Sequence, residues 1–64
     1  MSTKISLKAA RVNAEMSQET AAKRLNVSKQ TLSNWETGRT KIDAETFLKL
    51  CGIYKVQPAD VFLP

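Results

Sequence analysis

Two short segments within residues 17–38 each begin at a serine and end at a residue that tolerates a left-handed backbone. Ser17 and Ser28 suit helix starts, because a serine hydroxyl accepts hydrogen bonds from the free amides of the first turn. Asn26 and Gly38 suit helix ends, because both residue types adopt the left-handed conformation that terminates a helix. The spacing therefore predicts two short helices joined by a tight turn.

The apolar side chains around this turn predict how the two helices meet. Ala22 lies four residues before Asn26, so a small side chain stands where the helices must cross closely. Val27 and Leu32 supply the aliphatic groups that fill the angle between them. Two short helices in this arrangement form a helix-turn-helix, which we place at about residues 17–37.

The rest of the chain is also expected to be helical, because no stretch shows the alternation of β-branched residues that is typical of a strand. A first helix is predicted over residues 4–14, a fourth begins after Asp43, and a last one begins at Pro58. The predicted fold is all-α, a compact five-helix single domain over residues 1–64. The side chains expected to face the core are Leu7, Ala10 and Ala14 in the first helix and Ala44, Phe47, Leu48 and Cys51 in the fourth.

The length limits how such a domain can be stabilised. A chain of 64 residues buries only about 60% of the surface that its unfolded form exposes, so its stability is marginal unless disulfides, a metal or a partner subunit contribute. Cys51 is the single cysteine and cannot form an internal disulfide, and without histidine the chain lacks the side chains that hold zinc. We expect no metal and no cofactor. Helix packing or a partner subunit must therefore stabilise the domain.

Composition also argues against several classes of function. Catalysis usually recruits histidine or paired carboxylates, whereas this chain has no histidine and six scattered acids, so we expect no enzyme. Two glycines cannot build a phosphate-binding loop, and no small-molecule ligand is evident. The sequence has no membrane-length apolar run and no signal peptide, which favours a cytoplasmic protein that does not bind membranes.

The basic residues are concentrated in one part of the chain. Residues 1–41 carry eight Lys and Arg against three acids, whereas residues 42–64 carry two against three, and the chain as a whole has a formal charge of +4. This asymmetry is expected when one face of a protein meets a polyanion.

The helix-turn-helix segment resembles the lambda repressor/Cro-like family, also called the Xre family. The resemblance extends over roughly residues 7–62. Its motif residues are Gln18, Ala22, Ser28, Thr31, Leu32, Ser33, Trp35, Glu36 and Gly38. This family usually has leucine in place of Ala21 and glycine in place of Asn26 and Lys55. The resemblance implies a DNA-binding domain of the lambda-repressor type.

The second helix of the motif is predicted to read DNA. Over residues 28–36 it measures about 13 Å, so it can lie in a major groove about 12 Å wide. Glutamine and asparagine can bond adenine through two hydrogen bonds, and lysine can donate to guanine. The predicted base-reading residues are Lys29, Gln30, Ser33 and Asn34. The alternative is that these side chains form only a solvated helix surface.

A different set of residues is expected to contact phosphates. A helix N-terminus favours an anion, and the glutamine that this family has at the position of Gln18 bonds a phosphate. Basic and hydroxyl side chains after Gly38 can bracket the DNA backbone on the other side of the reading helix. The predicted phosphate contacts are Ser17, Gln18, Ser28, Thr31, Arg39, Thr40 and Lys41.

The resemblance also implies two structural features outside the DNA contacts. Arg11 and Glu36 occupy positions that form an ion pair in this family; the alternative is two solvated charges. Members commonly dimerise through the C-terminal region, and a dimer can read two half-sites about 34 Å apart. The tentative interface residues are Val56, Pro58, Val61, Phe62 and Leu63, although these side chains can instead cover the core.

The sequence therefore favours a sequence-specific double-stranded DNA-binding transcriptional regulator, a repressor that acts as a homodimer on a palindromic operator. One alternative is an antitoxin-like module that binds a protein partner as well as DNA. Another is a protein that binds nucleic acid without sequence preference.

Overall fold

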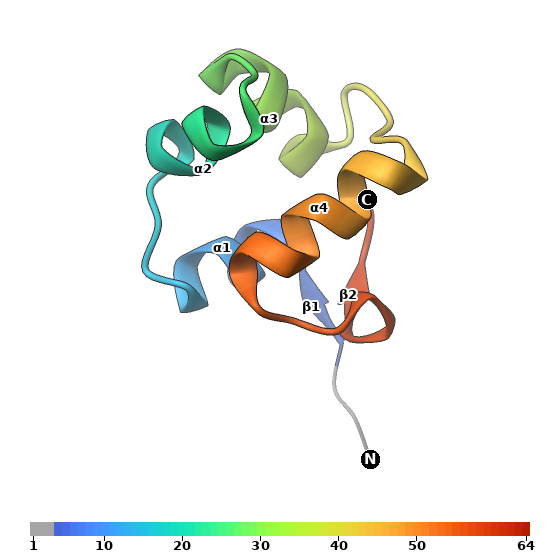
Figure 1. Cartoon of the computed structure of the whole chain (residues 1–64). Helices are drawn as coiled ribbons and strands as arrows, with labels where there is room; N and C mark the ends of the chain where they lie inside the picture. The colour runs from blue at the N-terminus through green and yellow to red at the C-terminus, as the bar shows by residue number, and fades with distance from the viewer. Residues whose placement is uncertain (1–3) are drawn as a thin grey trace.

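The computed structural model describes residues 4–64, which form four α-helices, one short 3₁₀ turn and two short strands (Figure 1). Their order is β1 (Ile5–Ser6), α1 (Leu7–Asn13), α2 (Gln18–Leu25), α3 (Lys29–Thr37), α4 (Ala44–Tyr54), the 3₁₀ turn η1 (Pro58–Asp60) and β2 (Val61–Phe62). The domain is mainly helical, as predicted, but the expected fifth helix is wrong. Pro58 starts only a three-residue turn, after which the chain becomes extended.

Each α-helix begins at a side chain that accepts a hydrogen bond from the backbone amide three residues later. Ser17 and Ser28 cap α2 and α3, and Asp43 caps α4, as the sequence predicted. Ser6 caps α1, so this helix starts at Leu7 and not at residue 4. Ile5 and Ser6 are extended because they pair with Val61 and Phe62 near the end of the chain.

Three of the helices end at a residue in the left-handed conformation. Asn26 and Gly38, with φ of 61° and 81°, end α2 and α3 where the sequence placed those ends. Lys55, with φ of 57°, ends α4 in the same way although it has a side chain.

The two strands join the beginning and the end of the described chain. Ile5 pairs with Val61 and Ser6 with Phe62 in a parallel two-stranded arrangement. The sequence did not predict strands here, because two residues are too few to show an alternating pattern. This pairing brings Val61 into the core.

The core lies between α4 and the other helices, and none of the helices in residues 4–64 is long and apolar enough to cross a membrane. Phe47, Leu50, Cys51 and Tyr54 form the inward face of α4. The predicted face was partly wrong: Leu48 is 56% exposed and Ala44 is exposed as well. The buried core residues are Leu7, Ala10, Ala21, Ala22, Leu32, Leu50, Cys51, Tyr54 and Val61.

Candidate nucleic-acid interface

Helices α2 and α3 form the predicted helix-turn-helix at the end of the molecule opposite the two strands (Figure 1). Ala22 and Leu32 are fully buried where the two helices pack. The Val27 amide donates to the Ala22 carbonyl at 3.0 Å, and the Val27 side chain packs against the core. Since the inner sides of both helices are fixed in this way, the outer face of α3 is held rigidly toward solvent.

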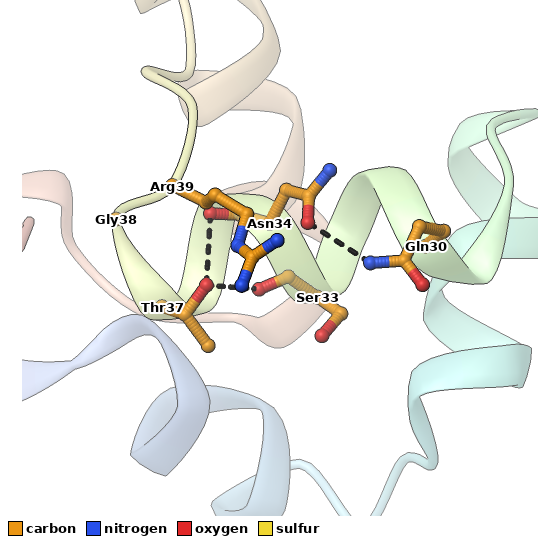
Figure 2. Close-up of a pocket in the computed structure, with 6 residues that line it drawn as sticks. All are labelled: Gln30, Ser33, Asn34, Thr37, Gly38 and Arg39. Carbon is orange, nitrogen blue, oxygen red and sulfur yellow. Dashed lines mark hydrogen bonds between the residues drawn. The ribbon is translucent and has the colours of Figure 1, made fainter.

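The outer face of α3 carries a hollow of about 440 Å³, which we call the α3 hollow (Figure 2). Its lining residues are Gln30, Ser33, Asn34, Thr37, Gly38 and Arg39. Three of the four predicted base-reading residues therefore lie together. The fourth, Lys29, is exposed at the start of α3 and does not line the hollow.

Thr37 also lines this hollow, although the sequence analysis did not select it. Its hydroxyl donates to the Ser33 carbonyl at 3.0 Å. It lies four residues after Ser33 and seven after Gln30, so helical spacing from the predicted readers was the signal that could have found it.

Gln30 and Asn34 contact each other across one turn of α3. The Gln30 side-chain nitrogen Nε2 donates to Asn34 Oδ1 at 2.9 Å (Figure 2). Two side chains predicted to read bases are therefore joined by a hydrogen bond.

The predicted phosphate contacts lie at the starts of α2 and α3 and directly after α3. The hydroxyl of Ser17 accepts from the Thr20 amide at 3.1 Å, and the hydroxyl of Ser28 accepts from the Thr31 amide at the same distance. Thr31 also shares a 2.8 Å side-chain hydrogen bond with Ser28. These hydroxyls are fixed at the helix starts, where free backbone amides and the helix dipole favour anions.

Gln18 has a role that the sequence did not indicate. Its Nε2 donates to Glu36 Oε1 at 2.9 Å, which connects the start of α2 to the end of α3. An amide nitrogen carries two hydrogens, so the second hydrogen of Gln18 Nε2 is left to donate to a phosphate. That phosphate contact stays a prediction.

Arg39, Thr40 and Lys41 are exposed directly after α3. The Arg39 backbone amide donates to the Asn34 carbonyl at 2.9 Å, which fixes the start of this segment to the helix end. The basic side chains therefore lie at the opposite end of α3 from Ser28.

Arg11 and Glu36 form a buried ion pair, so the alternative of two solvated charges is wrong. Arg11 Nε lies 2.8 Å from Glu36 Oε2, and the two side chains are 9% and 3% exposed. Another guanidinium nitrogen of Arg11 donates to the Met16 carbonyl at 2.8 Å. The pair fixes α1 to the end of α3, next to the predicted DNA-binding surface.

The structure divides the tentative dimer interface into buried and exposed residues. Val61 is only 6% exposed and Val56 packs against the core, so these two belong to the interior, as the alternative held. Pro58, Phe62 and Leu63 are exposed. The surface available to a partner is therefore smaller than predicted.

Trp35 and Cys51 belong to the interior. Trp35 is half-buried against the core, and Cys51 is buried. Burial raises the pKa of the Cys51 thiol, because a thiolate is poorly solvated there. This site therefore disfavours the reactive thiolate form.

Comparison with known proteins agrees with this geometry. Residues 7–61 match a family described as "Helix-turn-helix". The chain is 42% identical over 50 residues to the HTH-type transcriptional regulator ImmR of Bacillus subtilis (strain 168), a match that covers 78% of this chain and 39% of that protein. The chain therefore belongs to the Xre-like helix-turn-helix family of DNA-binding transcriptional regulator domains.

Proposed function

We propose that the domain binds one preferred double-stranded DNA sequence through α3 and represses transcription by occupying a promoter. The observation that carries this proposal is the α3 hollow, in which Gln30, Ser33 and Asn34 present polar groups on one solvent-facing side. A nine-residue helix is about 13 Å long, which suits insertion into the major groove.

The division of contacts follows from the positions of the side chains. Polar groups in the middle of α3 can meet base edges, whose donors and acceptors differ between base pairs in the major groove. The helix starts at Ser17 and Ser28, together with Arg39 and Lys41 beyond α3, can hold phosphates on either side. We expect the first group to give sequence preference and the second to give affinity for any duplex.

A dimer on a palindromic operator is part of the same proposal. One reading helix contacts only a few base pairs, and a second copy increases both affinity and selectivity. Phe62 is 48% exposed and Leu63 is 43% exposed, and with Pro58 they form the apolar surface that we propose for a symmetric contact.

Selection of bound duplexes from a random pool tests the proposal. We expect one enriched motif with two inverted half-sites about one helical turn apart. Affinity for the selected duplex should exceed affinity for a scrambled duplex at the same salt concentration by roughly a thousandfold or more. Equal affinity for both duplexes would instead indicate binding without sequence preference.

The exposed Phe62 and Leu63 also fit a second function, in which a different protein covers them. This is the antitoxin-like alternative, and sedimentation and co-purification distinguish it from a homodimer. A homodimer that sediments as one species and dissociates on Phe62→Ser supports the dimer proposal. A stoichiometric second protein lost on the same substitution supports the alternative.

A further inference from the structure

The hydrogen bond between Gln30 and Asn34 determines which groups each side chain can offer to DNA. A side-chain amide has two N–H donors and an oxygen with two lone pairs. Gln30 uses one of its hydrogens in the bond at 2.9 Å, so its oxygen and second hydrogen stay available. Asn34 turns its oxygen toward Gln30, with one lone pair accepting this bond, and Figure 2 shows its nitrogen directed away from Gln30.

These remaining groups match different bases. Gln30 keeps one donor and one acceptor side by side, which is the pattern that adenine requires through N6 and N7. Asn34 turns its N–H donors away from the pair. Guanine offers two neighbouring acceptors, N7 and O6, whereas adenine places a donor beside N7 that would face the donors of Asn34.

On the basis of the proposed function, we propose that Gln30 holds the Asn34 oxygen toward itself, so that Asn34 meets DNA through its N–H donors and prefers guanine over adenine at its base pair. Gln30 is then a specificity-determining residue at two positions of the operator: the one it contacts and the one that Asn34 contacts. Asparagine alone has no such bias, because a free asparagine amide can bond adenine through both its oxygen and its nitrogen.

The surroundings support a fixed arrangement of the pair. Residues four apart lie on the same side of a helix, and a glutamine–asparagine hydrogen bond at this spacing stabilises the pair. The Asn34 backbone is also held, because its carbonyl accepts from the Arg39 amide at 2.9 Å. Both side chains line the α3 hollow, where a base edge would meet them together.

The test measures base preference at the position that Asn34 contacts. That base pair is identified as the one at which Asn34→Ala loses discrimination, and duplexes with each of the four base pairs there are then compared. We expect the unmodified domain to favour guanine over adenine roughly tenfold or more. Gln30→Ala should bring this ratio close to one, because the freed Asn34 amide can turn its oxygen toward DNA.

Gln30→Glu gives a sharper outcome, because a carboxylate can only accept. Asn34 would then donate to residue 30 and present its oxygen and one hydrogen to DNA, so its preference should change from guanine to adenine. Gln57→Ala is the matched control, because Gln57 is an exposed glutamine outside the α3 hollow and its loss should leave the ratio unchanged.

Three results would overturn the inference: adenine preferred by the unmodified domain at this position, a ratio that neither Gln30 substitution changes, or discrimination that Asn34→Ala leaves intact everywhere. The proposed function would survive each of these, because a preferred sequence would still exist. Failure of the proposed function has a different signature, which is no preference of the unmodified domain at any position.

Discussion

Arg11 Nε lies 2.8 Å from Glu36 Oε2, although 25 residues separate them in the chain. The Glu36 carboxylate also accepts from Gln18, so one buried acid connects α1, the start of α2 and the end of α3. The orientation of the proposed reading helix relative to the rest of the domain depends on this carboxylate.

Glu36→Ala should therefore destabilise the domain strongly. Removing one partner of a buried ion pair leaves an uncompensated charge, here on Arg11, and costs about 3 to 5 kcal/mol. A domain of this size has little stability to lose, so we expect a large decrease in the urea midpoint or complete unfolding.

The matched control is the exposed pair of Glu45 and Lys49. Lys49 Nζ lies 3.7 Å from Glu45 Oε1, and the side chains of Glu45 and Lys49 are 81% and 66% exposed. Glu45→Ala should change the free energy of unfolding by about 0.5 kcal/mol or less. Glu36→Gln should lie between the two, because it keeps hydrogen-bonding groups near Arg11. Equal midpoints for Glu36→Ala and Glu45→Ala would contradict this account.

Tyr54→Phe should stabilise the domain. The Tyr54 hydroxyl is buried and has no hydrogen-bond partner within residues 4–64. A buried polar group without a partner costs about 1 to 3 kcal/mol, so replacing it with hydrogen should raise the free energy of unfolding by about 1 kcal/mol. Chemical denaturation at neutral pH tests this, and a clear loss of stability would show that the hydroxyl has a partner.

The same tyrosine should make the domain less stable at alkaline pH. Burial, assisted by the charge of Glu36, raises the pKa of Tyr54 from 10.0 to about 12. Well below pH 10 the hydroxyl is protonated in both the folded and the unfolded chain, so it does not make the stability depend on pH. As the pH rises from 10 toward 12, the unfolded chain loses this proton first, so folding stability falls.

Tyr54 is the single tyrosine, so tyrosinate absorbance follows its ionisation directly. We expect a midpoint close to 12 while the domain stays folded, and less alkaline destabilisation in Tyr54→Phe than in the unmodified domain. An absorbance midpoint near 10 in the folded domain would contradict the buried position.

Replacing each of the two glycines by alanine should have opposite effects. A Cβ at Gly52 would have no heavy atom within 4 Å, so Gly52→Ala should stabilise α4 by about 0.5 to 1 kcal/mol. Gly38 has φ of +81°, and a Cβ there would lie 3.0 Å from Pro64 Cβ. Gly38→Ala should therefore destabilise by about 1 to 2 kcal/mol. Thermal denaturation of the two variants checks the expected difference in sign.

Lys55→Gly should also stabilise the domain. Lys55 ends α4 with φ of 57°, a conformation that costs a residue with a Cβ about 1 to 2 kcal/mol, part of which the greater freedom of glycine in the unfolded chain offsets. We expect a net gain of about 0.5 to 1 kcal/mol. Asn26→Gly is the control: asparagine already tolerates this geometry, and a gain as large as that of Lys55→Gly would contradict the explanation.

Arg39→Ala and Gln30→Ala should weaken DNA binding in different ways. If Arg39 neutralises one phosphate, its loss should weaken binding to every duplex and reduce the slope of log affinity against log salt by about 1. Gln30→Ala should cost about 1 to 3 kcal/mol on the preferred duplex and little on a random one. Equal losses on both duplexes for both variants would contradict the division of contacts.

The helix-turn-helix could be predicted from sequence because its boundaries depend on single residues. Ser17 and Ser28 start helices and Asn26 and Gly38 end them through local geometry, and the structure places all four as predicted. The inward face of α4 could not be assigned in the same way. Apolar residues lie on more than one side of that helix, and only packing against the other helices selects Leu50 over Leu48.

The candidate site shows the same division between local and long-range information. Helical spacing from Gln30 to Asn34 places both on one side of α3, which sequence alone predicts. The hydrogen bond of Gln18 to Glu36 and the pairing of Ile5 with Val61 join residues far apart in the chain. No local pattern indicates such contacts, so they required the three-dimensional structure.

Titration of the domain with its selected duplex, followed by backbone amide chemical shifts, tests the central claim most directly. If the outer face of α3 reads DNA, the largest changes should fall on residues 28–41 and at the start of α2. The exposed face of α4 around Leu48 and Gly52 should change little. Changes that are largest on α4 and absent from α3 would contradict the account.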